Sequence, residues 1–332
     1  METPPPPTPS GRPYKSSEEM DAAELAWWEK FSGIEEQFAW VQTPPIQRFL
    51  RGRYVRRIIE LTPPGGRIAD LGCGMGWLAV LLGKMGARQV VGIDFSPAQI
   101  ARARMLAAES GVADRVVFEV GSAAELASRM DRFDVVILHA FLHHLSVSEI
   151  QNVLDTARFM LDTGGRLVIF EPVQYPFGQR HILQKALVRL LFWLAKRSGL
   201  AAGLGPLNRR PKAEEQSTRE LFAKRSAGIA PHGPSPKEMP FAPDEIQALV
   251  AERFRIVGRE PCMSISHHFA SENLLMELSS PKLARALRWP TLALARTLES
   301  LALRFRMPPA GLWIFEMFVC EPYRPKPVSN AS

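Results

Sequence analysis

The sequence predicts an α/β fold: a doubly wound, mostly parallel sheet of seven strands with helices on both faces. Three observations support this prediction. Short apolar runs alternate with longer helical patterns between residues 67 and 171, as expected for parallel strands joined by helical crossovers. A glycine-rich turn follows the first apolar run. Two longer stretches then interrupt the alternation, which predicts helical cap insertions after the fifth and sixth strands.

The predicted elements follow one another in a regular order. Strands are expected at 67–70, 89–94, 115–120, 133–139, 165–171, 254–264 and 313–320. Helices are expected at 46–61, 76–86, 97–110, 122–128, 147–161 and 243–252. Aromatic residues at near-helical spacing predict a further helix within 22–43, which the pair Pro44-Pro45 would end.

Changes in composition along the chain predict its organisation. Proline-rich and polar ends predict disordered tails, and the segments rich in glycine and proline predict the insertions. The expected units are a tail at 1–20, N-terminal helices at 21–62, the core at 63–172, a cap insertion at 173–243, the rest of the core at 244–322 with a second helical insertion at 269–310, and a tail at 323–332.

The turn after the first strand runs from Asp70 to Gly76, and Gly72, Gly74 and Gly76 alternate in it with larger residues. Glycines let the backbone turn sharply and let a ligand approach its amides, while the following helix directs its positive end toward the same place. A dinucleotide fingerprint has the spacing G-x-G-x-x-G, but Trp77 stands where that spacing requires its last glycine. The spacing therefore disfavours a dinucleotide.

Two carboxylates indicate which ligand the turn would bind. Asp70 ends the first strand directly before the glycines, where a carboxylate would repel a pyrophosphate but would suit an ammonium group. Asp94 ends the second strand, where an acidic residue can accept hydrogen bonds from both hydroxyls of a ribose. The pattern predicts a ligand that combines an amino group with a nucleoside.

Five segments in the same order resemble the cofactor-binding half of the class I S-adenosylmethionine-dependent methyltransferases of the small-molecule type. They are the glycine turn 70–76, the acidic turn 94–96, the segment 121–124, the strand and loop 133–145, and the glycine turn and strand 161–169. The resemblance covers about residues 50–172 and implies a Rossmann-like fold whose last strand is antiparallel. It implies that S-adenosylmethionine is the cofactor, and that the residues that bind it are Asp70, Gly72, Cys73, Gly74, Met75, Gly76, Asp94, Phe95, Ser122, Ala123 and His139. At the position of Ser122 the family often has Asp.

Histidines at the cofactor end of the sheet are candidates for a general base, which helps methyl transfer to oxygen or to carbon. The candidates are His143 and His144, after the fourth strand, and His267 and His268, after the sixth. The alternative is that they serve packing or are solvated. Glu171 and Tyr175 are weaker candidates. Cys and His residues have no metal-ligand spacing, so no metal is expected.

The loop after the fourth strand also bears on the class of substrate. Methyltransferases that act on amino groups of nucleic-acid bases or of glutamine often have Asn/Asp-Pro-Pro-Tyr/Phe there, whereas this chain has His139-Ala140-Phe141-Leu142. The difference argues against those substrates. The sequence predicts O- or C-methylation of a small or lipophilic acceptor. The alternatives are methylation of a carrier-bound or protein substrate, and a non-catalytic protein that keeps the cofactor fold.

The net charge of +7 comes from two basic segments, 179–225 and 282–306. Within them, 179–198 and 290–306 read as amphipathic helices with a basic border. These helices would close the pocket, contact a membrane surface peripherally, or dock an acidic carrier protein; no nucleic-acid-binding motif is present. Three cysteines, no signal peptide and no apolar run long enough to cross a membrane predict a cytoplasmic protein with a possible peripheral membrane contact.

Overall fold

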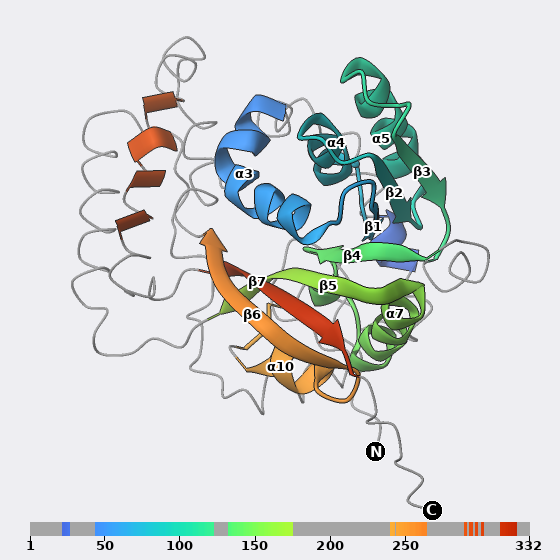
Figure 1. The fold of residues 1–332 in the computed structure, drawn as a ribbon, viewed down its shortest axis with the longest axis vertical. Coiled ribbons are helices and arrows are strands. Elements are labelled where there is room, and N and C mark those ends of the chain that lie inside the picture. The colour runs from blue at the N-terminus through green and yellow to red at the C-terminus, as the bar shows by residue number, and fades with distance from the viewer. Residues whose placement is uncertain are drawn as a thin grey trace, which may run out of the picture.

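A single sheet of seven strands forms the centre of the fold in the computed structural model of the protein. The described residues are 22–26, 44–122, 132–174, 240–242, 244–263 and 313–323, with parts of 289–301. The strands are β1 (Arg67–Leu71), β2 (Gln89–Asp94), β3 (Val116–Val120), β4 (Phe133–His139), β5 (Leu161–Gln174), β6 (Phe254–Met263) and β7 (Trp313–Pro322). Their order across the sheet is β3-β2-β1-β4-β5-β7-β6, and Figure 1 shows the sheet between two layers of helices.

The described helices cover the two faces of the sheet. One face carries α3 (Pro44–Leu61), α4 (Trp77–Lys84) and α5 (Pro97–Glu109), and the other carries α7 (Val147–Met160) and α10 (Glu245–Val250). Side chains alternate along each strand and so divide the core in two. In β4, Val135 and Ile137 pack on the side of α3, whereas Val136 and Leu138 pack on the side of α7.

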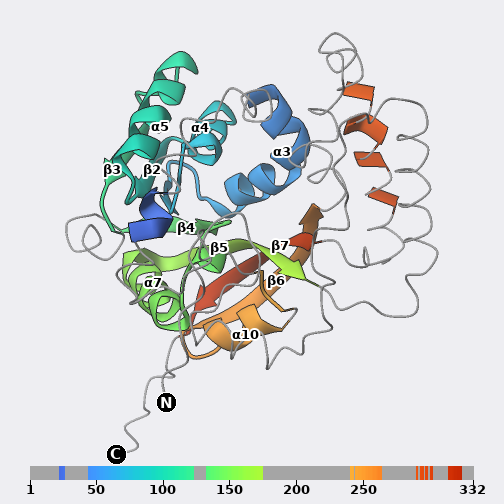
Figure 2. The same cartoon turned by 180° about the vertical axis from the view of Figure 1, so that it is seen from behind.

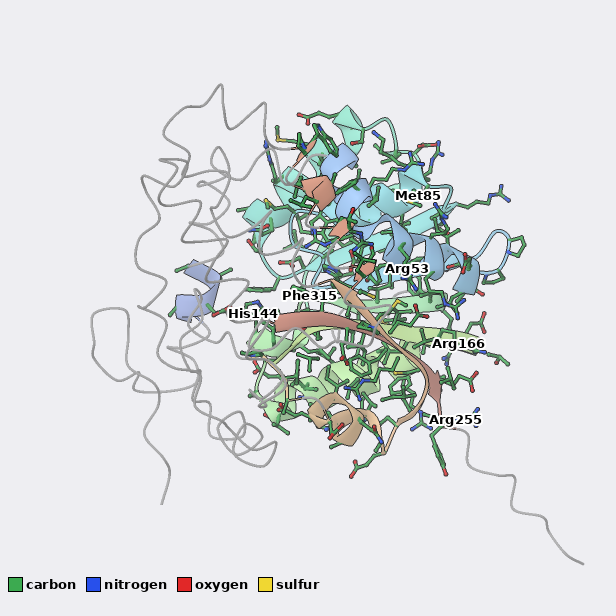
Figure 3. The ribbon with its side chains drawn as sticks, turned by 90° about the vertical axis from the view of Figure 1, so that its left-hand side faces the viewer. Arg53, Met85, His144, Arg166, Arg255 and Phe315 are labelled. Carbon is green, nitrogen blue, oxygen red and sulfur yellow. The ribbon has the colours of Figure 1, made fainter. Side chains whose placement is uncertain are left out.

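The direction of the strands determines where loops gather. Strands β1 to β5 are parallel, and β7 runs antiparallel to both β5 and β6. Strands β5 and β6 therefore end at the same edge as β1 and β4, which is the edge where ligands bind in open α/β sheets. Figure 3 shows His144 and Phe315 at this edge and Arg166 and Arg255 at the opposite edge.

The predicted α/β fold with a seven-stranded, mostly parallel sheet is confirmed. Apart from those of β5, the described boundaries lie within two residues of the predicted ones. Two of the differences have a clear physical reason. Helix α3 already begins at Pro44, because the first turn of a helix does not use the N–H group that proline lacks. Strand β5 begins at Leu161 rather than at residue 165, because Leu161 pairs with Phe133 ahead of a register shift. The tails, most of both cap insertions and the predicted helix 122–128 lie outside the described residues, so those boundaries stay predictions.

The start of α4 approaches the sheet very closely. Gly76 precedes this helix with a φ of 74°, in the left-handed region. A Cβ atom built on Gly76 would lie 2.5 Å from the ring of Phe118 on β3 and 2.7 Å from the side chain of Ala103 on α5. Both the backbone conformation and the lack of space therefore require glycine. Gly111 has a similar φ of 67°, but nothing lies within 4 Å of the same built atom.

Substitutions at Gly76 and Gly111 allow the energetic cost of backbone strain to be measured apart from that of overpacking. We expect Gly111→Ala to lower the free energy of unfolding by about 1–2 kcal/mol, from the left-handed conformation alone. Gly76→Ala adds a collision with Phe118, so we expect a further loss of about 1–3 kcal/mol. Urea denaturation of the two variants and the wild type measures both losses. Equal losses in the two variants would contradict the close approach.

Candidate active site

The glycine turn between β1 and α4 is held against the end of β2 by backbone hydrogen bonds. The N–H groups of Gly72 and Cys73 both donate to the carbonyl of Ile93, at 2.8 and 3.0 Å. Gly72 and Gly74 have φ values of 71° and 52°, like Gly76 in the left-handed region. The turn therefore has a fixed, compact shape whose backbone is determined by its glycines.

Asp70 lies below this turn as a buried carboxylate. Its side chain is 1% exposed, and neither of its oxygens has a hydrogen-bond partner among the described residues. Burial, and to a smaller degree the neighbouring Asp94, raises the pKa of Asp70 to about 8. A buried polar group without a partner is costly. Asp70 therefore has the property expected of a group whose partner is a ligand.

Asp94 has a different environment at the end of β2. Its Oδ2 accepts a hydrogen bond from the N–H of Gly74 at 2.8 Å, and its Oδ1 accepts one from the N–H of Ser96 at 3.0 Å. Burial raises the pKa of Asp94, although these backbone hydrogen bonds oppose the shift. Each carboxylate oxygen keeps a second lone pair, so Asp94 can hold the turn and still accept hydrogen bonds from ligand hydroxyls.

The remaining predicted cofactor contacts lie around this turn. Cys73 is buried, and burial raises the pKa of its thiol. Met75 is half-buried, and Phe95, directly after Asp94, is 43% exposed. Ser122 is exposed after β3, and Ala123 lies outside the described residues. An exposed aromatic ring next to the Asp94 carboxylate provides a surface on which a base can stack.

His139 ends β4 within a group of aromatic rings. Its ring stacks on Phe170 of β5 at 4.7 Å and meets Trp77 of α4 edge-on at 4.8 Å. Phe170 in turn stacks on Phe315 of β7 at 5.1 Å. The three parallel rings of His139, Phe170 and Phe315 form an aromatic row, which leads from the glycine turn toward β7.

Two residues of α3 join the site without a motif that identifies them. The guanidinium of Arg51 lies 4.1 Å from the centre of the Trp77 ring, and burial lowers its pKa to about 10. The ring of Tyr54 lies 4.3 Å from that of Phe170 and 5.7 Å from that of His139. The only sequence signal that could have found them is the basic run 51–57 immediately before the first strand.

His143 is held by a buried carboxylate. It lies in the short 3-10 helix η1 (Leu142–His144), and its Nδ1 is 2.6 Å from Oε2 of Glu171 on β5. The other oxygen of Glu171 accepts hydrogen bonds from the N–H groups of Phe141 and Leu142, at 2.8 and 2.7 Å. Glu171 therefore fixes both the loop after β4 and the orientation of the imidazole.

His144 is paired with a different part of the chain. Its Nδ1 lies 3.1 Å from Oε1 of Glu24, in the helical segment 22–26. Both side chains are largely buried. As the sequence predicts, His143 and His144 lie at the edge of the sheet where β4 ends. The structure shows that each has a carboxylate partner. The other candidates, His267 and His268, and Tyr175 lie outside the described residues.

The basic segments are described only in small part. Segment 179–198 lies outside the described residues. In segment 290–306, Leu292 is buried, whereas Leu294 and Leu301 are exposed. No helix of the described chain is long and apolar enough to cross a membrane. Its described histidines, cysteines and carboxylates include no group of three that could hold a metal ion.

The arrangement suits a ligand with an amino group at one end and hydroxyl groups near its middle. Asp70 can bind the amino group and Asp94 the hydroxyl groups. Both carboxylates are buried beside the same turn. A charged partner would restore the ionised form of Asp70, because an opposite charge lowers the pKa of a carboxyl. A phosphate would face two carboxylates here and would be repelled.

The amino-acid sequence is similar to those of known methyltransferases. Residues 68–165 match the family model of a methyltransferase domain. The chain is 34% identical over 155 residues to a ubiquinone biosynthesis O-methyltransferase of Azorhizobium caulinodans, which covers 45% of this chain and 58% of the relative. It is 36% identical over 119 residues to the 27-O-demethylrifamycin SV methyltransferase of Amycolatopsis mediterranei, covering 35% of this chain and 43% of the relative. The chain thus spans about half the length of these two curated relatives.

The burial of Asp70 predicts a dependence of stability on pH. Its pKa is about 8 in the folded protein and about 4 when unfolded. The folded state therefore holds this proton more tightly between these values, and Asp70 makes the protein less stable as the pH rises from 4 to 8. Asp70→Asn cannot ionise, so we expect its stability relative to wild type to increase by about 2–4 kcal/mol between pH 5 and pH 8.

Urea denaturation without cofactor, at pH 5 and at pH 8, measures this change. Asp114→Asn is the matched control, because Asp114 is fully exposed and the pKa of its carboxyl is lowered by a hydrogen bond to Arg115. We expect no comparable gain in that variant. Parallel pH profiles for wild type and Asp70→Asn would show that Asp70 is not desolvated.

Proposed function

Since the chain contains a class I S-adenosylmethionine-dependent methyltransferase domain, we propose that it transfers the methyl group of S-adenosylmethionine to an oxygen or carbon atom of a small, lipophilic acceptor. The observation that carries the proposal is Asp70: a buried carboxylate, without a partner among the described residues, below a turn with three left-handed glycines. The cofactor carries the ammonium group and the ribose that Asp70 and Asp94 suit.

Each part of the cofactor has a group on this chain that fits it. Asp70 would bind the ammonium group and Asp94 the ribose hydroxyls. Arg51 lies beside Trp77 and has the charge that suits the carboxylate of the amino-acid end. The adenine would lie by Phe95, Ser122 and Ala123, and Met75 and His139 would border the sulfonium. When bound, the cofactor supplies a methyl group on a positively charged sulfur, from which an in-line nucleophile can take it.

The proposed acceptor class draws on the relatives and on the described surroundings of the site. Both relatives reported above are named as methyltransferases of small molecules, one in ubiquinone biosynthesis and one acting on 27-O-demethylrifamycin SV. The aromatic row His139, Phe170 and Phe315 offers an apolar surface beside the turn. One alternative is a carrier-bound or protein substrate, which the basic segments would dock. Another is a non-catalytic role, in which the protein would bind the cofactor without turnover.

We propose that His143 is the general base for an oxygen acceptor. A carboxylate on one imidazole nitrogen fixes the tautomer of the ring and stabilises it when it gains a proton. Glu171 provides this partner at 2.6 Å from Nδ1 of His143. The chain's own residues would thus position a base and hold the proton on Nε2. His144, with Glu24 on its Nδ1, is the second candidate.

A peripheral contact with membranes stays a prediction. The exposed Leu294 and Leu301 support it, since side chains seven residues apart share one helix face. Such a contact would suit a lipophilic acceptor, which partitions into membranes.

Binding of the cofactor tests the proposal directly. At pH 7 Asp70 is protonated in the free protein, because its pKa is about 8, and pairing with an ammonium group requires the carboxylate. We therefore expect S-adenosylhomocysteine to release about one proton on binding at pH 7. Isothermal titration in buffers of different ionisation enthalpy measures this release, which Asp70→Asn should abolish.

The ribose assignment makes a second prediction in the same titration. We expect Asp94→Ala to weaken binding by about 1–3 kcal/mol, because charge-assisted hydrogen bonds are lost. Asp114→Ala, at an exposed site, should bind as the wild type does. An unchanged affinity in Asp94→Ala would refute the assignment. Preferential binding of an adenosine phosphate would overturn the proposed cofactor.

The proposed base predicts a separation of binding from turnover. We expect His143→Gln to keep its affinity for S-adenosylhomocysteine and to lower kcat by about 100-fold or more, as loss of a general base does. The assay is methyl transfer to a phenolic acceptor that the wild type methylates, at several pH values. A normal kcat together with a lower Tm would show that His143 only holds the loop after β4, and the same assay on His144→Gln then tests the second candidate.

A further inference from the structure

A cavity of about 350 Å³ lies beside the site, between α3, the end of β6 and the segment 289–301. The segment 289–301 lies next to α3, as the ring contact of Trp289 with Phe49 at 5.5 Å indicates, and Figure 2 shows the two side by side. Tyr54 and Phe170 line the cavity on its inner side, and Cys262 lines it from β6. Glu260, Pro261 and Cys262 place the cavity beside the end of β6.

The described lining is strongly basic. Five arginines and two glutamates line the cavity, and Figure 3 shows one of the arginines, Arg53, on α3. The two glutamates, Glu60 and Glu260, both lie near Arg57, at 3.4 and 3.7 Å from its guanidinium. Arg53 and Arg56 have no ion pair among the described residues. Among the described lining residues, arginines therefore outnumber carboxylates.

The inner side of the cavity carries a polar group without a partner. The side chain of Tyr54 is 3% exposed, and its hydroxyl has no hydrogen-bond partner among the described residues. A buried hydroxyl is normally hydrogen-bonded, so a ligand is the natural partner for it. The Tyr54 ring also touches Phe170 and lies near His139. Phe170 of the aromatic row thus connects the cavity with the surroundings of the glycine turn.

Arg53 of α3 and Arg296 of the segment 289–301 both line the cavity together with Cys262. Arg296 reaches from the segment 289–301, and its Nη1 lies 3.4 Å from the carbonyl of Cys262. Both guanidiniums act on the Cys262 thiol and lower its pKa, against the larger effect of burial, which raises that pKa to about 12. Two cations from separate elements therefore line the cavity where β6 ends.

We propose that this cavity binds the acceptor by an anionic group, a carboxylate or a phosphate ester, carried on an aromatic or apolar body. Arg53 and Arg296 bind the anion, Tyr54 donates a hydrogen bond, and the body lies along Phe170 toward His139. The inference rests on the proposed function, because it names the substrate class of the same site. Arg51 also lines the cavity, but we assign it to the cofactor because its guanidinium lies against Trp77 beside the glycine turn.

Ligand-observed NMR titration, with the protein saturated with S-adenosylhomocysteine, tests this proposal. The probes are benzoate, phenyl phosphate, neutral benzamide and inorganic phosphate. We expect one of the two aromatic anions to bind at least tenfold more tightly than benzamide and more tightly than inorganic phosphate. Whichever binds better identifies the anionic group. Equal binding of benzoate, phenyl phosphate and benzamide would overturn the proposal, and so would inorganic phosphate binding as well as phenyl phosphate.

Three variants test the residues. Arg53→Gln/Arg296→Gln should reduce the preference for the anion to less than threefold. Glu260→Gln should tighten anion binding about threefold, because it removes a carboxylate 3.7 Å from Arg57. Arg255→Gln, on the same strand at the opposite edge of the sheet (Figure 3), should bind as the wild type does. Loss of the preference in Arg255→Gln, or its persistence in the double variant, would overturn the assignment.

The affinity for S-adenosylhomocysteine keeps the two proposals distinguishable. We expect the double variant to bind it as the wild type does, whereas Arg51→Gln should weaken it about tenfold. If the wild type does not bind S-adenosylhomocysteine, the proposed function fails while the anion titration, repeated without it, still reports on the cavity. Arg51→Gln and the double variant could both lose binding of S-adenosylhomocysteine and keep the preference for the aromatic anion. In that case the arginines serve the cofactor, and the acceptor proposal fails.

Discussion

The hydrogen bond from the N–H of Gly74 to Asp94 is the interaction on which the site depends. It joins the turn after β1 to the end of β2 at 2.8 Å, and two further bonds from the turn to Ile93 support it. Without this connection the glycines would be free to take many conformations, since each populates both signs of φ. The bond helps to hold the turn in its observed shape, in which Asp70 is buried. The same carboxylate that shapes the turn is therefore the one that would bind the ribose.

A second constraint is the stacking of aromatic rings across neighbouring strands of the sheet. His139, Phe170 and Phe315 come from three neighbouring strands. His139 and Phe170 are partners in the sheet register, whereas Phe315 pairs with Pro172, two residues beyond Phe170 on the same face of β5. The middle ring of this row, Phe170, also lines the arginine-lined cavity, whereas His139 contacts Trp77 beside the glycine turn. Aromatic rings hold an apolar body without competing for hydrogen bonds, which leaves the choice of ligand to the polar groups at each end.

The parts of this site that the sequence predicts are those set by local rules. The strands read as short apolar runs, and the turn from Asp70 to Gly76 is recognisable because its glycines serve backbone conformations that other residues avoid. Arg51 and Tyr54 could not be found in this way, since their role depends on how α3 packs against Trp77 and Phe170. The pairs of His143 with Glu171 and of His144 with Glu24 join residues far apart in the chain, and no spacing rule connects them.

Asp70, near the end of β1, and Glu171, near the end of β5, are both buried carboxylates, but their environments differ. Glu171 is fully buried and accepts three hydrogen bonds, from two backbone N–H groups and from His143, so its burial is compensated within the protein. Asp70 is equally buried, but no described residue donates to it. A buried carboxylate with partners stabilises the loop it holds, whereas one without partners lowers stability until a cation arrives. The contrast explains why Asp70, rather than Glu171, is the group whose ionisation should follow ligand binding.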